Sequence, residues 1–201
     1  MPVSKQGETK ADPDFGPVSH LTRWAEAIKD GTRAAPVERW HPPSCGAIDI
    51  RIDRGGAWHH EGRRIDREAL VKLFARVLRR EADGSYVLVT PAEKLTIRVE
   101  DTPFLAVDLD VEPGPPRLLR FLTNLGEVVP LDAVHPLRIA DTDDDAFVPY
   151  VTVRPGIEAR LTRALAESLV HLAEARDGAV GIESGGHFFV IGRVAAMDRL
   201  P

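Results

Sequence analysis

Apolar and polar residues alternate along much of the chain, which is the pattern of half-buried β-strands. In residues 48–53 isoleucine alternates with aspartate and arginine, and the run Arg54-Gly55-Gly56 predicts a turn into a second strand at 57–62. Further strands are predicted at 86–90, 94–99, 105–111, 118–122, 127–129, 137–139 and 147–154, and a hairpin at 179–191. The strand at 105–111 is expected to bury Leu105, Val107, Leu109 and Val111.

Three other segments show the period of amphipathic helices, in which apolar residues recur about every 3.6 positions. The first predicted helix is short and covers 21–28. The second covers 66–80, with Asp66 as its capping residue and two arginines in its last turn, where positive charge is favourable. The third covers 156–175 and begins just after Pro155, a residue that the first turn of a helix tolerates.

The order strand, helix, hairpin occurs twice along the chain, at 57–99 and at 147–192. This repeat of topology predicts an α+β fold of two related halves, each a curved antiparallel sheet with one packed helix. A proline-rich run at 113–116 is the strongest internal break. We therefore expect a flexible tail at 1–18, an N-terminal half with its leading helix at 19–112, and a C-terminal half at 113–201.

Composition excludes several classes of protein. The 201 residues are 43% hydrophobic and 28% charged, as in globular proteins, and a net charge of −5 argues against a dedicated DNA-binding protein. We expect no membrane span and no secretory signal, because long apolar runs are missing and the N-terminus is polar. The single cysteine, Cys45, forbids an intramolecular disulfide, so we expect a cytoplasmic protein.

The run WHPPSC at 40–45 carries the most distinctive chemistry. Its prolines predict a stiff loop, which could form a pocket wall with Trp40 and His41 stacking on a ligand or hydrogen-bonding to it. A hydrolase could instead use the Cys45 thiolate with His41 as its base, or could use Glu93. Without any chemistry, Trp40 would fill the core and Cys45 would be a small buried hydrophobe.

Basic residues lie where an anion could bind. Lys94 and Arg98 share one face of a predicted strand that Glu93 precedes, and Arg154 ends another strand just before the predicted helix at 156–175. Two or three such groups beside backbone N–H donors would form an anion site. The alternative is that they pair across strands with nearby aspartates.

The sequence does not contain a clear motif for a metal or a cofactor. Residues His59 and His60 are adjacent in a predicted strand, so they point to opposite faces and do not easily share one ion. We predict no metal site, and glycine motifs for binding phosphate or a dinucleotide are missing, so the cofactor is left open.

Three longer runs resemble an uncharacterised bacterial family, a domain of unknown function of about this size. They are WHPPSCGAIDIRIDRGGAW at 40–58, VTPAEKLTIRVEDTPF at 89–104 and VRPGIEARL at 153–161. The resemblance implies a duplicated α+β core whose C-terminal half is pleckstrin-homology-like. It also implies a pocket for a nucleotide-like ligand at the interface of the halves, and a role in signal transduction.

Together these observations predict a protein that binds a small anionic, nucleotide-like ligand between two halves. A hydrolase and a protein-interaction module that recruits its partner through the C-terminal sheet are the alternatives. The sequence leaves the oligomeric state open. The expected ligand-binding residues are Trp40, His41, Glu93, Lys94, Arg98 and Arg154.

Overall fold

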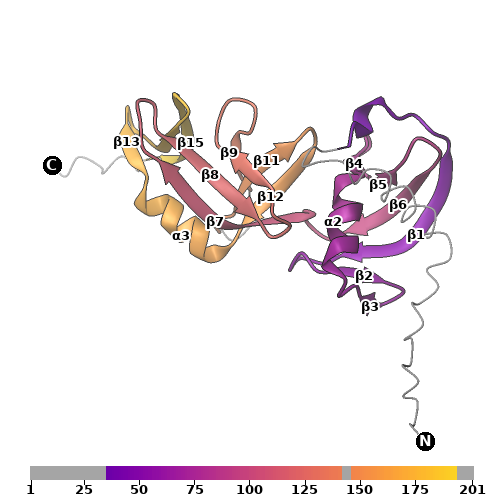
Figure 1. Ribbon diagram of the computed structural model, residues 1–201. Helices are drawn as coiled ribbons and strands as arrows, with labels where there is room; N and C mark the ends of the chain where they lie inside the picture. Colours follow the sequence, from indigo (N-terminus) through magenta and orange to yellow (C-terminus); the bar gives the residue numbers. More distant parts are fainter. Residues whose placement is uncertain (1–34, 142–145, 194–201) are drawn as a thin grey trace, which may run out of the picture.

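The computed structural model describes residues 35–141 and 146–193, and these form two groups of strands that lie side by side (Figure 1). The predicted tail at 1–18 and the predicted helix at 21–28 lie outside the described residues. Each group contains one six-stranded sheet and one α-helix, so the expected α+β fold with two halves is confirmed. A pleckstrin-homology-like character for the second half stays a prediction.

The first half is built around a sheet with the strand order β3-β2-β1-β6-β5-β4. Within it β1 and β6 are parallel, and the other neighbours are antiparallel. The elements are η1 Val37–Arg39, β1 Ser44–Ile52, β2 Trp58–His60, β3 Arg63–Arg64, α2 Glu68–Arg76, β4 Leu78–Arg80, β5 Tyr86–Val89 and β6 Lys94–Val99.

The second half repeats this plan with the strand order β10-β11-β12-β7-β8-β9, and β12 is parallel to β7. A third, smaller sheet follows α3 in the order β13-β14-β15. The elements are β7 Phe104–Glu112, β8 Leu118–Thr123, β9 Val128–Pro130, β10 Leu137–Ile139, β11 Pro149–Arg154, β12 Ile157–Leu161, α3 Arg163–His171, β13 Glu174–Arg176, β14 Ala179–Ser184 and β15 His187–Arg193.

The structure differs from the prediction in the position of the boundary, expected at 113–116, and in the sheets, which are mostly but not wholly antiparallel. Residues 113–116 connect β7 to β8 within the second sheet, so the change from one half to the other comes before Phe104. Each sheet also contains one parallel pair, because a long crossover returns the chain beside an earlier strand. Neither feature leaves a local signal, since both depend on which distant strands become neighbours.

The two predicted helices that lie within the described residues, at 66–80 and 156–175, are longer than the observed helices. Helix α2 buries Leu70 and Phe74 of its predicted apolar stripe, but it ends at Arg76, with Arg67 rather than Asp66 at its N-cap position. Residues 78–80 pair with β5 instead. The apolar stripe of the helix continues into this strand, so periodicity alone cannot place the boundary.

The predicted helix at 156–175 contains β12, α3 and β13. Gly156 has a φ of +70° and forms the turn between β11 and β12, a left-handed conformation that a helix does not contain. Ile157 and Leu161 are buried together with the intervening Ala159, which is the period of a strand. Residues four apart satisfy a helical stripe as well, and this explains the error.

The inner face of β7 also differs from the prediction. Phe104 and Ala106 are fully buried, whereas Val107 and Val111 are 43% and 38% exposed. The register of β7 against β8 shifts between Ala106 and Asp108, and such a bulge moves the following residues to the other face. Buried apolar residues of both halves form one continuous cluster.

Candidate functional site

A cavity of about 550 Å³ opens on the first sheet, at the end of β6. Arginines from three strands line it: Arg51 of β1, Arg80 of β4 and Arg98 of β6. Tyr86 and Ile97 also line it, together with the acids Glu100 and Asp101. The volume lies within the range of about 300–1,000 Å³ that is common for small-molecule sites.

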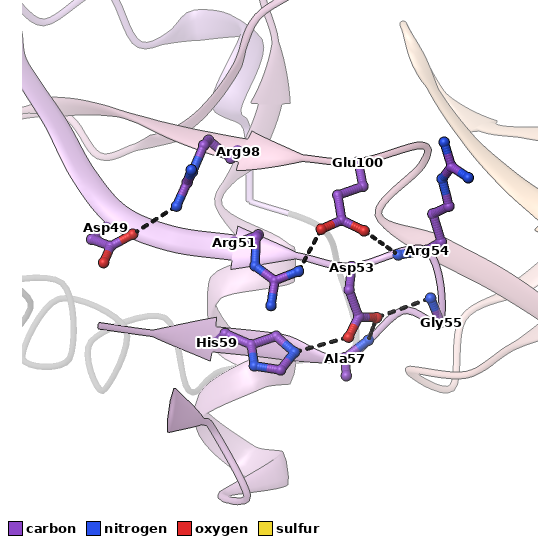
Figure 2. Close-up of polar contacts among 9 residues, drawn as sticks. All are labelled: Asp49, Arg51, Asp53, Arg54, Gly55, Ala57, His59, Arg98 and Glu100. Atoms are coloured by element: carbon purple, nitrogen blue, oxygen red, sulfur yellow. Dashed lines mark hydrogen bonds and ion pairs between the residues drawn. The ribbon is translucent and has the colours of Figure 1, made fainter. Parts of the chain in front are cut away.

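Two of these arginines are direct neighbours in the sheet. Arg51 and Arg98 are register partners on the parallel strands β1 and β6, and Figure 2 shows each with a carboxylate partner. Arg98 Nη2 lies 3.1 Å from Asp49 Oδ1, and Arg51 donates to Glu100. The acids on either side make it possible for two like charges to stand next to each other.

The ion pair between Arg51 and Glu100 is held more firmly than the ion pair between Arg98 and Asp49. The side chains of Arg98 and Asp49 are 73% and 55% exposed, and solvent screens such pairs to less than about 1 kcal/mol. Glu100 is held more firmly, because it accepts hydrogen bonds from Arg51 and from the backbone N–H of Arg54. These bonds, led by the one from Arg51, lower the pKa of Glu100.

The third arginine, Arg80, is in a different situation. Its Nε donates to the carbonyl of Gly84 at 3.3 Å and its Nη1 lies 3.5 Å from the carbonyl oxygen of Gly156. Its guanidinium lies 5.5 Å from the centre of the Tyr86 ring, and burial raises the pKa of that tyrosine. Within the described residues no ion pair joins Arg80 to a carboxylate, and its hydrogen-bond acceptors are two uncharged backbone carbonyls.

The cavity reaches the boundary between the halves through Asp101, which also lines it. Asp101 accepts a hydrogen bond of 2.9 Å from the Tyr150 hydroxyl and lies 3.0 Å from Nη1 of Arg160, both in the second half. Burial, followed by the bond to Asp101, raises the pKa of Tyr150 to about 12. One acid of the cavity is therefore already neutralised across the boundary.

A tight turn that begins at Asp53, directly after β1, positions the backbone N–H that binds Glu100. Asp53 accepts hydrogen bonds of 2.9 Å from the N–H groups of Gly55 and Ala57, and His59 Nε2 lies 2.8 Å from it (Figure 2). Burial opposes ionisation of Asp53, but the hydrogen bonds from His59 and the two N–H groups outweigh it and lower the pKa. The turn thereby fixes Arg54, which holds Glu100.

Of the predicted ligand-binding residues, Arg98 lines this cavity. Lys94 does not line it, since its Nζ lies 2.9 Å from Glu81, which also accepts a bond of 2.7 Å from Arg79. Glu93 precedes β6 and uses its backbone to bond with Thr90. The shared face of Lys94 and Arg98 therefore does not bring the two charges to one site.

Arg154 has a structural position. Its side chain is only 13% exposed, and its Nη2 donates to the carbonyls of Ala75 in α2 and Leu78 in β4. Its guanidinium also lies 5.4 Å from the Phe104 ring, and burial lowers its pKa. Arg154 thus joins the second half to α2, and it is not among the residues that line the cavity.

The run at 40–45 consists of a loop at 40–43 and the first two residues of β1, and none of it lines the cavity. Trp40 is half-buried against the core and its carbonyl accepts a bond of 2.7 Å from the buried Arg79. His41 is exposed. Cys45 is exposed too, so the expectation that it is buried is wrong, and its Sγ lies 3.8 Å from the carbonyl oxygen of Pro43.

Sequence reasoning missed Arg51, Arg80 and Tyr86. The polar positions of the strand at 48–53 include Arg51, but its pairing with Arg98 follows from the register of two strands far apart in the chain. The predicted helix at 66–80 includes Arg80, which the structure places in β4. The missing signal in both cases is strand pairing.

A second cavity of about 720 Å³ lies beside α3 in the second half. It is lined mainly by apolar side chains such as Phe147 and Leu161. Its two arginines are engaged, Arg160 with Asp101 and Arg163 with Glu167. The second cavity is therefore larger than the first, but both arginines that line it are paired with carboxylates.

Within residues 35–141 and 146–193 no group of three or more histidine, cysteine, aspartate or glutamate residues could hold a metal ion. No helix there has the length and hydropathy needed to cross a membrane.

Solved structures and family models resemble this chain. A DUF1285 family protein from Silicibacter pomeroyi DSS-3 is 41% identical, with a TM-score of 0.78, over 87% of this chain and 95% of that one. A DUF1285 family protein from Shewanella baltica OS155 is 30% identical, with a TM-score of 0.49, over 61% of this chain and 90% of that one. No curated protein matches.

The family models follow the two halves of the structure. The N-terminal domain of DUF1285, a domain of unknown function, matches residues 35–102, and the C-terminal domain matches residues 103–191. The point between these matches is also where the chain passes from the first sheet to the second. The chain belongs to the DUF1285 family of proteins of unknown function.

Proposed function

We propose that this protein is a cytoplasmic binding protein for a small anionic ligand of nucleotide-like size, held in the cavity of Arg51, Arg80 and Arg98. The observation that carries the proposal is Arg80, a cation that faces the cavity without a carboxylate partner in the described part of the chain. An anion would supply the missing charge. The Tyr86 ring beside it offers a surface for an apolar part of the ligand.

The position of the cavity fits a role in signal transduction. Arg80 bonds to Gly156 and Asp101 bonds to Tyr150, so two residues of its wall contact the second half. A ligand that alters either contact alters the boundary between the halves, which is the kind of change that a sensor passes on.

The test is a thermal-shift screen of the full chain against nucleotides and other phosphorylated metabolites, followed by calorimetric titration of the hits. A ligand at 100 times its dissociation constant stabilises the folded state by about 2.7 kcal/mol. We expect a hit whose binding is lost in Arg80→Ala and retained in Arg64→Ala. Arg64 is a matched control, since it is 70% exposed in the same sheet and does not line the cavity.

Two results would count against this function. Either no compound raises the melting temperature of the wild-type protein, or every hit binds Arg80→Ala as tightly as the wild type.

A further inference from the structure

The outer face of the second sheet carries an exposed row of apolar residues across β7, β8 and β9 (Figure 1). Leu122 of β8 and Val128 of β9 are register partners, and they are 37% and 61% exposed. On the other side of Leu122 its register partner is Asp108, and the exposed Val107 is the extra residue at the bulge just before Asp108. We call Val107, Leu122 and Val128 the apolar row. Contiguous apolar surface of this kind is typical of interaction sites.

Acidic residues run along the same face. Asp108 and Asp110 of β7 are exposed, and Arg120, the register partner of Asp110, forms its ion pair with Glu112 instead. No ion pair joins Asp108 or Asp110 to a basic residue in the part of the chain that the structure describes. The same face of a second copy is a poor partner, because it would bring two more aspartates against these two. A suitable partner has apolar side chains together with a basic one.

The chain itself contains such a segment, the predicted helix at 21–28, which lies outside the described residues. At about 100° per residue, Lys29 would flank the apolar stripe of this helix, and Glu26 would lie on the opposite side. A helix this short is marginal in water and is stabilised chiefly by packing of its apolar stripe. The stripe consists of Leu21, Trp24, Ala25 and Ile28.

The described chain begins near the edge strand of this face. The carbonyl of Val37 accepts a bond of 2.7 Å from Arg79 of β4, and Arg154 donates to the adjacent residue of β4. Arg154 also lies 3.5 Å from Glu127, the residue that precedes β9. Because β9 is an edge strand, the chain can pass round it to the outer face. Residues 29–34 span about 20 Å when extended, whereas neighbouring strands lie only about 5 Å apart, so the connection is long enough.

We propose that residues 21–28 dock as a helix on the apolar row, with Lys29 toward Asp108 and Asp110. The docked segment covers Leu122 and Val128 and joins the start of the first half to the second half. No residue of the apolar row lines the arginine cavity, so this proposal does not depend on the anion-binding function.

A nitroxide spin label at position 23 tests the docking in the full chain. Helical geometry places Arg23 opposite the apolar stripe, so Arg23→Cys holds the label away from the contact, and Cys45→Ser removes the native thiol. We expect the NMR signals of the backbone amides at 120–122 and 128–129 to lose most of their intensity. The amide signals of β2 and β3 in the first half should be retained.

Substitutions in the labelled chain assign the contact to single residues. Val128→Ser and Leu122→Ser should each return the lost signals toward full intensity, because they remove apolar contact area. Val134→Ser is the matched control, since Val134 is 73% exposed in the same half but outside the apolar row, and it should change nothing. Asp110→Lys should lower the ratio of docked to free segment about two- to fivefold. Adding Lys29→Asp to Asp110→Lys should restore the docking, and damage to the fold cannot produce such a recovery.

Three results would overturn the proposal. The first is a loss of signal that is confined to the first half or absent from β8 and β9. The second is equal behaviour of Val128→Ser and Val134→Ser. The third is that a spin-labelled chain weakens the signals of an unlabelled one, because the segment would then dock on a second copy.

Discussion

At the scale of single residues, burial divides the arginines into two kinds. Arg79 and Arg154 are mostly buried, and their guanidinium groups donate to backbone carbonyls of other segments. Arg80 and Arg98 are exposed and line the cavity. A sequence shows all four as the same residue type, yet only the exposed pair is available to a ligand.

Replacing Arg154 tests its structural role. Arg154→Ala removes a charged, mostly buried donor to the carbonyls of Ala75 and Leu78, so we expect the free energy of unfolding to fall by about 1.5–3 kcal/mol. Urea denaturation measures this loss. Arg163→Ala is the control, because the Arg163 side chain is 95% exposed, and it should change stability by less than about 0.5 kcal/mol. Equal effects of both substitutions would contradict the assignment.

Glu81 should make stability depend on pH. Hydrogen bonds from Lys94 and then Arg79 lower its pKa below the usual 4.5, so its contribution is complete above that value and is lost as the pH falls through the lowered pKa. Glu81→Gln should therefore cost about 1.5–3 kcal/mol at pH 7, and the difference from wild type should shrink as the pH falls below 4.5. Urea denaturation between pH 7 and pH 3 measures it, and a pH-independent difference would refute it.

At the scale of elements, a buried serine fastens the third sheet to the second. Ser184, at the end of β14, is fully buried, accepts a bond of 2.9 Å from the N–H of Leu119 and donates one of 2.7 Å to the carbonyl of Leu131. The adjacent Gly185 N–H donates to the carbonyl of Arg117. These bonds give the hairpin of β14 and β15 a fixed place against β8 and the segment after β9.

Two serine substitutions separate this contact from a general effect of serine. Ser184→Ala removes both bonds and leaves a buried N–H and a buried carbonyl unpaired, so we expect a loss of about 1–3 kcal/mol in the free energy of unfolding. Ser168→Ala should be neutral or slightly stabilising, because Ser168 is exposed on α3 and bonds only to Ala164. A neutral Ser184→Ala would show that the bonds contribute nothing. Urea denaturation resolves both.

At the scale of the whole molecule, the halves are joined by packing and by hydrogen bonds. The Thr102 hydroxyl donates to the carbonyl of Glu158, and Arg160 Nη2 donates to the carbonyl of Arg54 at 2.6 Å. Gly56, in the turn after β1, packs against Asn124 of the second half so closely that a Cβ would lie 2.9 Å from its Nδ2. The boundary therefore has a defined geometry, as coupling to the cavity requires.

A pair of glycine substitutions tests this packing. Gly56 and Gly62 have φ values of +75° and +76°, so alanine is strained equally at both, but a Cβ at Gly62 would meet nothing within 4 Å. Gly56→Ala should therefore be less stable than Gly62→Ala by about 1–3 kcal/mol, the usual cost of overpacking. Thermal unfolding compares them. Equal melting temperatures would show that the halves do not pack tightly here.

Local patterns determined much of the fold. Alternation located most of the strands, the turn residues at 54–56 located the first hairpin, and the repeated order of elements indicated two halves. These features depend on neighbours in the chain, whose side chains fall on fixed faces of a strand or helix. Arg98 was also recognised as a candidate for anion binding, because its exposed face follows from the same alternation.

Tertiary structure alone decided the rest. The parallel pairs, the passage between the halves before Phe104 and the neighbouring positions of Arg51 and Arg98 all depend on which distant strands meet. Periodicity could not separate α2 from β4, nor β12 from α3, because an apolar residue at every fourth position satisfies both periods. Arg154 was assigned to a ligand and is buried against α2, since the burial of a charge depends on the segments that close over it.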